Sequence, residues 1–233
     1  MIRFREASYA YENADSVLKG VNLKINPGLT LLVGPNGCGK STFLKMAAGV
    51  EKPDSGSVFI QEFDLWSDEV AARKNLAYLP EQPDLTPYAS IREIVDLVCR
   101  LRREPLEKGR EALEFFGLEK VSGSTVRELS MGQRRRAVFA ACLIGDSQHI
   151  LLDEPLEGMD VGIQKKIIEW ITRRLKEGVC LLVVSHSMDP FLELTTRALT
   201  IKEGRAFLFE SLPVIQTEKL NFIKNLAQGI LPK

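Results

Sequence analysis

The chain of 233 residues has no excess of charge of either sign and no long apolar run. Lysine plus arginine number 31, and so do aspartate plus glutamate, which gives a formal net charge of zero. The composition therefore lacks the basic field typical of nucleic-acid binding and the acidic excess of disordered chains. The longest apolar run, residues 137–144, is too short to cross a bilayer. We expect a soluble protein that binds no nucleic acid.

Cysteine is also scarce in this chain. None of its four cysteines forms a Cys-x-x-Cys pair, so we expect reduced thiols in a cytoplasmic protein. Residues 1–6 contain no apolar core of a signal peptide, which agrees with that expectation. At this length and with 45% hydrophobic residues, the chain can form one large domain, or one domain with a subdomain.

A glycine-rich stretch, residues 34–42, fits the phosphate-binding pattern G-x-x-x-x-G-K-[ST]. An apolar strand over 29–33 precedes it, and a helix over 43–48 follows. Glycines let the backbone turn tightly so that N–H groups surround an anion, and the helix start adds a partial positive charge. The pattern predicts a triphosphate site, with ATP as the ligand, formed by Gly34, Pro35, Asn36, Gly37, Cys38, Gly39, Lys40, Ser41 and Thr42.

Lys40 should reach the outer phosphates, and the Ser41 hydroxyl should hold Mg²⁺. The simpler alternative is a glycine-rich turn before an ordinary helix. That alternative does not explain why every position of the phosphate-binding pattern is matched between a predicted strand and a predicted helix. Tyr11, at the end of a predicted strand over 2–11, offers an aromatic ring that could stack on a base or simply pack.

The remaining chain alternates between predicted strands and helices. Strands are expected over 17–25, 57–61, 76–80, 150–152 and 179–184, with a closing hairpin over 197–201 and 205–210. Helices are expected over 106–117, 133–144 and 160–177, and Ser90 with Glu93 forms a capping box that starts another. The helical block interrupts the alternation and predicts an inserted subdomain. A weakly amphipathic tail from residue 212 should pack on the domain.

Polar side chains follow several predicted strands. Asp153 and Glu154 lie at the carboxyl end of a buried strand, where parallel sheets place their sites. Because strand neighbours point to opposite sides, Asp153 could join the Mg²⁺ shell and Glu154 could orient or deprotonate water. His186 ends another strand at the same sheet edge. Gln82 follows a third strand and could touch Mg²⁺ or a water, although taken alone it is an ordinary loop residue.

Residues 129–133 provide a second candidate site for phosphate. Ser130 should cap the following helix, and Gly132 would let the backbone approach a ligand closely. The arginines at 134–136 are expected to form a mostly solvated helix face that adds positive potential. His149, in place of an apolar strand residue, should have a structural partner.

Taken together and in this order, these motifs resemble those of the ATP-binding cassette (ABC) ATPases over residues 2–210. The resemblance rests on residues 34–42, 129–133, 151–155, 160 and 185–186. It implies a P-loop α/β core with a mostly parallel sheet, an N-terminal antiparallel β-subdomain and an inserted α-helical subdomain. The implied domain spans 1–210 with the helical subdomain at about 84–145, and the tail spans 211–233.

The resemblance also implies roles for individual residues. Tyr11 would stack on adenine, and Gln82 would be the Q-loop glutamine that contributes to the Mg²⁺ site. Glu154 would be the catalytic glutamate, Asp160 the D-loop aspartate and His186 the switch histidine. The signature residues Ser130, Gly132 and Gln133 would contact ATP held by another subunit. Met131 replaces the usual signature glycine and Glu157 a smaller residue, but every catalytic group is kept.

The family implies three candidate functions. The first is the ATP-hydrolysing subunit of a transporter, working as a homodimer or heterodimer with integral membrane subunits and peripheral on the inner face of the cell membrane. The segment 78–82, which ends at Gln82, resembles the exporter-type ATPases more than most importers. The absence of a long regulatory domain after residue 210 also favours the exporter type. The second is a soluble ATPase of translation or DNA repair, which usually carries two cassettes or a long coiled coil. The third, a module without hydrolysis, is opposed by Glu154 and His186.

Overall fold

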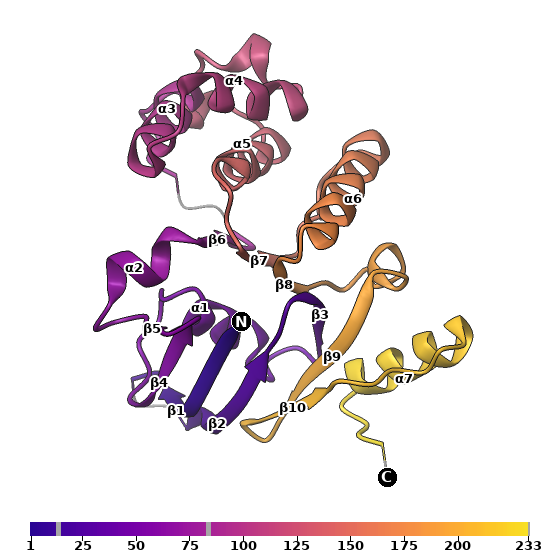
Figure 1. Ribbon diagram of the computed structural model, residues 1–233. Coiled ribbons are helices and arrows are strands. Elements are labelled where there is room, and N and C mark those ends of the chain that lie inside the picture. The colour runs from indigo at the N-terminus through magenta and orange to yellow at the C-terminus, as the bar shows by residue number, and fades with distance from the viewer. Residues whose placement is uncertain (13–14, 83–84, 233) are drawn as a thin grey trace.

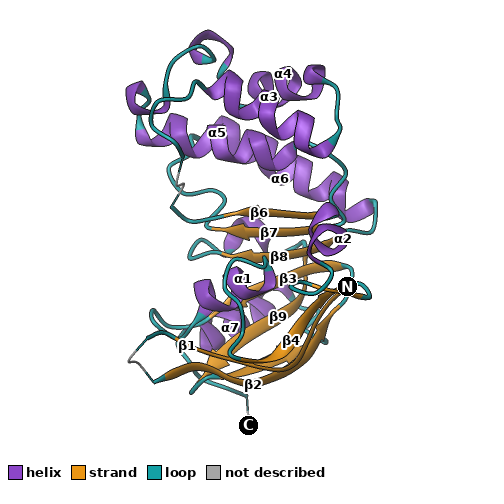
Figure 2. Ribbon diagram, turned by 90° about the vertical axis from the view of Figure 1, so that its left-hand side faces the viewer, coloured by secondary structure: helices purple, strands orange, loops and turns teal. Residues whose placement is uncertain are grey.

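The computed structural model describes residues 1–12, 15–82 and 85–232, and Figure 1 shows their arrangement. Two β-sheets lie on either side of one helix, and a group of helices extends beyond the larger sheet (Figure 2). This is the predicted α/β class, with an antiparallel β-subdomain, a mostly parallel sheet and a helical insert. Within the described ranges, no helix is both long and apolar enough to span a membrane.

The smaller sheet is antiparallel and has the strand order β2-β1-β4-β5. Its strands are β1 (Ile2–Ala10), β2 (Ser16–Ile25), β4 (Ser55–Ile60) and β5 (Phe63–Asp64). Ile2, Phe4, Ala7 and Tyr9 of β1 are buried, and the alternation is shifted once at a bulge between Phe4 and Ala7, as expected of a sheet with one covered face. That face packs on α1 (Lys40–Ala47), where the rings of Phe4 and Phe43 stack with centroids 4.4 Å apart.

The larger sheet has the strand order β10-β9-β3-β8-β7-β6. Its parallel strands are β9 (Thr195–Lys202), β3 (Gly28–Val33), β8 (Cys180–Val184), β7 (His149–Asp153) and β6 (Leu76–Leu79), and β10 (Arg205–Phe209) is the antiparallel edge. The central strands are buried on both faces, which explains their continuous apolar runs. Leu151 packs toward α1, whereas Ile150 and Leu152 pack toward the opposite helices.

The helical insert consists of α3 (Ile91–Arg102), α4 (Leu106–Phe115) and α5 (Met131–Leu143), and it lies at the top of Figure 1. The capping box predicted for Ser90 and Glu93 is present at the start of α3. Helix α6 (Val161–Lys176) packs beside α5, with the rings of Phe139 and Trp170 in edge contact at 6.0 Å. The insert is therefore continuous with the core that covers one face of the larger sheet.

Two short elements in the segment between β4 and β6 have no counterpart among the sequence predictions. These are β5 and α2 (Glu69–Lys74). The C-terminal tail forms α7 (Gln216–Ala227), whose buried residues Ile223 and Leu226 pack on the side of the sheet formed by β3 and β9. The predicted boundaries of the domain, the insert and the tail remain predictions.

Candidate nucleotide site

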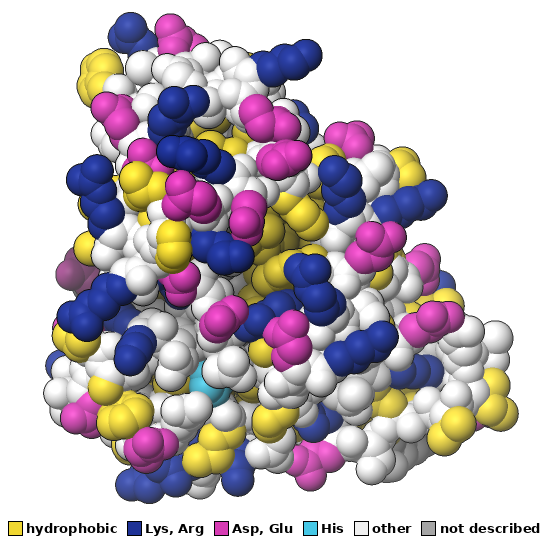
Figure 3. Space-filling model, turned by 45° about the horizontal axis from the view of Figure 1, so that its top comes forward, with side chains coloured by type: hydrophobic (Ala, Val, Ile, Leu, Met, Phe, Trp, Pro, Cys, Tyr) yellow, Lys and Arg dark blue, Asp and Glu magenta, His cyan; other side chains and the backbone are white. Residues whose placement is uncertain are grey.

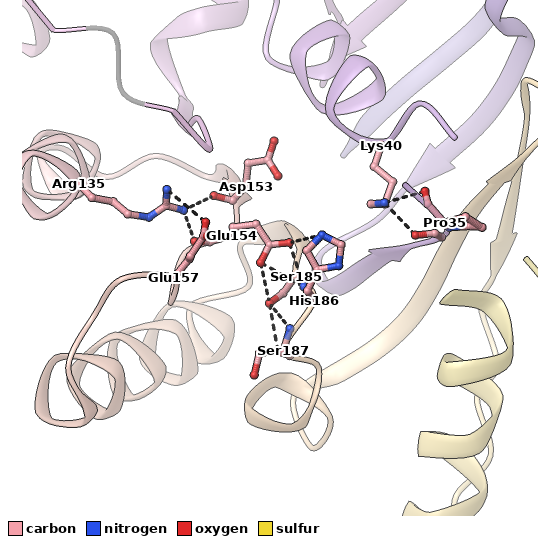
Figure 4. Close-up of polar contacts among 10 residues, drawn as sticks. Pro35, Lys40, Arg135, Asp153, Glu154, Glu157, Ser185, His186 and Ser187 are labelled. Carbon is pink, nitrogen blue, oxygen red and sulfur yellow. Dashed lines mark hydrogen bonds and ion pairs between the residues drawn. The ribbon is translucent and has the colours of Figure 1, made fainter. Parts of the chain in front are cut away.

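The phosphate loop joins β3 to α1, as its pattern predicts. Gly39 caps α1 with a φ of 106°, a conformation that side chains disfavour, and an added Cβ would lie 3.0 Å from Val17. The Lys40 ammonium donates to the carbonyl oxygens of Gly34 at 2.8 Å and Pro35 at 3.0 Å (Figure 4). The loop thus holds its lysine at the start of a helix, where anions are stabilised.

A cavity of about 460 Å³ opens beside this loop. Lys40, Ser41 and Thr42 line it from α1, Asp153 and Glu154 from the end of β7, and His186 from the end of β8. The parallel register places these last two strand ends side by side, because Asp153 pairs with Val184. The predicted phosphate ligands and three predicted catalytic or metal-binding side chains therefore share one cavity.

Asp153 has the character of a magnesium ligand. Burial, with help from the charges of Glu81 and Glu154, raises its pKa to about 6, and the nearby Ser41 hydroxyl opposes that shift. Its Oδ2 atom is buried without a hydrogen-bond partner among the described residues. A divalent cation would satisfy this oxygen and offset the clustered negative charge.

The small number of protein ligands at this cavity also fits Mg²⁺. No group of three or more His, Cys, Asp or Glu side chains suited to a metal occurs in the part of the chain that the structure describes. Mg²⁺ is usually held by one or two protein oxygens together with substrate phosphates and water. The Asp153 carboxylate and the Ser41 hydroxyl form such a set.

Glu154 is held against the end of β8. Its carboxylate accepts the backbone N–H of His186 at 2.9 and 3.1 Å and the Ser185 hydroxyl at 3.4 Å. The His186 ring lies 3.7 Å away and remains mostly exposed (Figure 4). Burial raises the pKa of Glu154 even though the His186 contacts lower it. A carboxylate with this balance is suited to accept a proton from water.

The predicted backbone of Glu154 needs correction. Alternation along one strand was expected to turn Asp153 and Glu154 to opposite sides, but β7 ends at Asp153. Glu154 instead adopts a left-handed backbone with a φ of 49°. Such a backbone is costly for a residue with a side chain and persists only where its surroundings enforce it. The chain therefore turns sharply between the two carboxylates.

Tyr11 follows β1 at the rim of the cavity, and 42% of its surface is exposed. Its hydroxyl lies 3.0 Å from the Thr42 hydroxyl, and its ring meets Tyr9 edge-on at 5.1 Å. The ring is thus fixed in place while part of its surface remains accessible, which is the arrangement that base stacking requires.

Gln82 lies three residues beyond Leu79, the last residue of β6, in an exposed position. Its neighbour Glu81, rather than Gln82, lines the cavity. Sequence reasoning missed Glu81, whose only signal is its place just after a buried strand that ends at this sheet edge.

Ser130 caps α5 in a capping box with Gln133. The Ser130 hydroxyl accepts the Gln133 N–H at 3.2 Å, and Gln133 accepts the Ser130 N–H at 2.9 Å. Ser130 and Met131 are exposed, and none of the described residues that line the cavity belongs to this helix start. Asp160 likewise caps α6 by accepting the Ile163 N–H at 3.0 Å. Ser130 and Met131 therefore face solvent, and the signature-like residues lie outside the cavity of their own chain.

The predicted solvated face at residues 134–136 is wrong. Arg135 is only 7% exposed, and its guanidinium donates to backbone carbonyls near the cavity. Arg134 and Arg136 are half-buried and donate to carbonyls of the helical insert. Unsatisfied carbonyls attract these planar donors, and that outweighs the preference of isolated arginines for water.

His149 is buried and has the polar partners that its position in a strand requires. Its Nε2 lies 2.9 Å from the Met1 amine and its Nδ1 lies 3.3 Å from the Asn75 carbonyl oxygen. Burial and the nearby amine lower the pKa of His149 to about 4. The residue sits at the amino end of β7, opposite the end that carries Asp153, so its role is separate from the cavity.

Comparison with known proteins places this chain in one family. The family model described as ABC transporter matches residues 18–157, more than half of the chain. The chain belongs to this family and is an ATP-binding, ATP-hydrolysing subunit of an ABC transporter.

Curated relatives include both exporters and importers. The chain is 28% identical to the SkfA peptide export ATP-binding protein SkfE of Bacillus subtilis, over 94% of this chain and 92% of SkfE. It is 33% identical to the spermidine/putrescine import ATP-binding protein PotA of Mesoplasma florum, over 81% of this chain. The match spans only 55% of PotA.

Solved structures of a bacterial ABC transporter cassette, MJ0796, share the fold. Its dimeric structure has a TM-score of 0.78 at 26% identity, with 88% of this chain and 96% of that chain covered. A second dimeric structure, at 25% identity and the same TM-score, shows a post-hydrolysis state bound to ADP and Pi. It covers 90% of this chain and 98% of that chain.

Proposed function

We propose that this chain works as a dimer in which each ATP lies between the phosphate loop of one subunit and the signature residues of the other. The observation that carries the proposal is the separation of the two motifs. The cavity holds Lys40, Asp153 and Glu154, whereas Ser130 lies outside it on an exposed helix start. A head-to-tail pair related by two-fold symmetry would bring both motifs to one nucleotide. The dimeric MJ0796 cassette supports this arrangement.

Residues 34–42 cradle the phosphates in this proposal, with Lys40 as the point charge and Tyr11 stacked on adenine. Asp153 and Ser41 would provide the Mg²⁺ site from within the cavity. Gln82, which does not line the cavity of the single chain, would join them only by a movement of the loop after β6. Bound Mg²⁺ would neutralise charge on the outer phosphates.

Glu154 orients the attacking water and takes up its proton, which the raised pKa of this carboxyl favours. His186, next to Glu154, contacts the outer phosphate. Ser130, Gly132 and Gln133 bind the nucleotide of the other subunit, and Asp160 lies at the contact between subunits.

The partners of the dimer are integral membrane subunits that carry the cargo. SkfE is named for peptide export and PotA for polyamine import. The match spans nearly all of SkfE and about half of PotA, and both relatives support a transport role for this chain. Charges of both signs are interspersed on the face shown in Figure 3, and this mixture supports a protein rather than a nucleic-acid partner.

Co-purification from solubilised membranes tests the transport role. A tagged full-length chain should retain a polytopic membrane protein after detergent extraction. Recovery of ribosomes or DNA-repair complexes without any membrane protein would instead support a soluble ATPase. The direction of transport is then tested in vesicles that contain the recovered complex, by following ATP-dependent movement of labelled candidate cargo.

A further inference from the structure

Arg135 makes an unusual set of contacts for an arginine in the second turn of a helix. One terminal nitrogen donates to the carbonyl oxygen of Glu81. The other donates to the carbonyl oxygens of Asp153, at 3.1 Å, and Glu154. The residue is 7% exposed. One buried guanidinium therefore joins the segment after β6 to the end of β7. Figure 4 shows the Arg135 side chain beside Asp153 and Glu154.

All three acceptor residues line the nucleotide cavity. Two of them, Asp153 and Glu154, are the proposed metal ligand and the proposed general base. The carbonyl of Glu154 belongs to the residue with the left-handed backbone. A charged donor on that carbonyl opposes relaxation of the backbone, so it fixes the direction in which the carboxylate leaves the chain.

The ion pair of Arg135 is a weaker contribution. Its guanidinium lies 3.7 Å from the carboxylate of Glu157, which is 63% exposed. Exposed carboxylates add little to such a pair because water screens them. The hydrogen bonds to the three backbone carbonyls, two of them buried, are therefore the contacts that hold the Arg135 guanidinium.

Arg135 also belongs to α5, the helix that begins at the signature residues. It lies five positions after Ser130, which is about 8 Å along the helix axis. A single rigid helix thus carries the residues proposed to touch the nucleotide of a second subunit and the residue that contacts the hydrolytic carboxylates of its own chain.

We propose that Arg135 is a positioning residue for ATP hydrolysis: it holds the backbones of Asp153 and Glu154 in place and links them to α5. The inference rests on the proposed function of Glu154. It assigns no contact between Arg135 and the nucleotide, so the residue acts on the rate of hydrolysis and leaves nucleotide binding largely unchanged.

Arg135→Met in the full chain is the test, because methionine fills much of the space without donating hydrogen bonds. We expect kcat to fall about 100-fold, the effect typical of a misplaced reacting group. KM for Mg-ATP and the affinity for a fluorescent ATP analogue should change less than about threefold. Arg135→Gln, which keeps two amide donors, should recover part of the rate.

Arg136→Met is the matched control. Arg136 lies on the same helix and donates to the Phe116 carbonyl at 3.2 Å, within the helical insert. Urea unfolding of each variant corrects the rates for the folded fraction. If Arg135→Met loses no more activity than Arg136→Met, the inference is overturned. If Arg135→Met does not fold, Arg135→Gln takes its place in every comparison and is judged by the same criterion.

A double variant separates positioning from general stability. On the Glu154→Gln background, Arg135→Met should lower the residual single-turnover rate by less than about threefold, because the positioning of the Glu154 carboxylate no longer contributes and, among the proposed reacting groups, only the contact with the Asp153 carbonyl remains to be lost. An additional loss as large as that in the wild-type background would show a merely structural role. If Glu154→Gln is itself fully active, the proposed function fails instead.

Discussion

The cavity beside the phosphate loop and the start of α5 differ in how their functional side chains are held. In the cavity, Glu154 and Asp153 are buried, their pKa values are raised, and neighbouring backbone groups fix their positions. At the start of α5, Ser130 is exposed and its hydroxyl accepts a capping hydrogen bond from the Gln133 N–H within its own turn. One region is assembled by the fold of a single chain, and the other is presented on its surface.

This difference indicates how the work is divided within the proposed dimer. Buried carboxylates need a rigid setting because small displacements reduce the rate of reaction. A contact that must form and break with each ATP is better placed on an exposed helix start, where its polar groups are satisfied before and after binding. Arg135 connects the two regions through α5.

Glu154→Gln should have the largest effect. It removes the general base from the buried region but keeps the shape of the side chain, so hydrolysis should fall about 1,000-fold while ATP binding persists. Steady-state ATPase assays and equilibrium binding of the fluorescent ATP analogue measure the two quantities. A rate close to that of the wild type would assign the proton transfer to another group.

Ser130→Asp tests the exposed region alone. Aspartate caps helices as well as serine does, but its charge would repel the nucleotide of a second subunit. We expect hydrolysis to fall about 100-fold with unchanged ATP binding to the monomer, by analogy with the loss of one transition-state donor. Ser90→Asp, at the matching cap of α3, is the control and should stay active. Equal losses in both variants would point to damage to the insert.

Tyr11→Ala should weaken Mg-ATP binding about tenfold, within the range of one aromatic stacking contact. Tyr11→Phe keeps the ring and loses only the 3.0 Å contact with Thr42, so it should bind nearly as tightly as the wild type. Binding titrations with ATP and with inorganic triphosphate separate base stacking from phosphate contacts. An equal loss for both ligands would contradict stacking.

His149→Gln tests whether the buried histidine at the amino end of β7 contributes to stability, in contrast to the carboxylates proposed for hydrolysis at the other end of the strand. The folded pKa of His149 is lowered to about 4 from 6.5, so the unfolded chain takes up the proton first. Its contribution to stability is present above pH 6.5 and is lost as the pH falls to about 4, by roughly 3 kcal/mol. Glutamine keeps a polar partner for the Met1 amine but does not titrate in this range.

Urea unfolding of both proteins at several pH values measures this difference. The nearby Cys180 thiol has its pKa raised to about 11 by burial and stays neutral throughout. The wild type should lose more stability than His149→Gln between pH 6.5 and 4. Parallel pH curves for the two proteins would contradict this role of His149.

The sequence predicts those parts of the fold and site that short-range patterns determine. The phosphate loop follows from glycine spacing and flanking apolar runs. The cap at Ser90 follows from a polar pair three residues apart, and the cap at Ser130 follows from a serine just before a predicted helix. The sheet-edge position of Asp153 follows from the end of an apolar run. Each of these signals lies within about ten residues of the feature.

The remaining features depend on contacts between distant segments. Arg135 looks like a surface residue because its acceptors, the carbonyls of Glu81 and Glu154, are far away in the sequence. The left-handed backbone at position 154 is occupied by glutamate rather than glycine, so the sequence carries no signal of this conformation. Helix α2 and strand β5 are too short to produce a clear hydrophobic period.

The central claim is that the cavity is half of a site that a second subunit completes. Sedimentation of Glu154→Gln with and without saturating Mg-ATP tests it most directly, because this variant binds the nucleotide without consuming it. The account predicts a monomer without nucleotide and a dimer with it, and the further change Ser130→Asp should abolish the dimer. A monomer at saturating Mg-ATP would contradict the shared site in a homodimer.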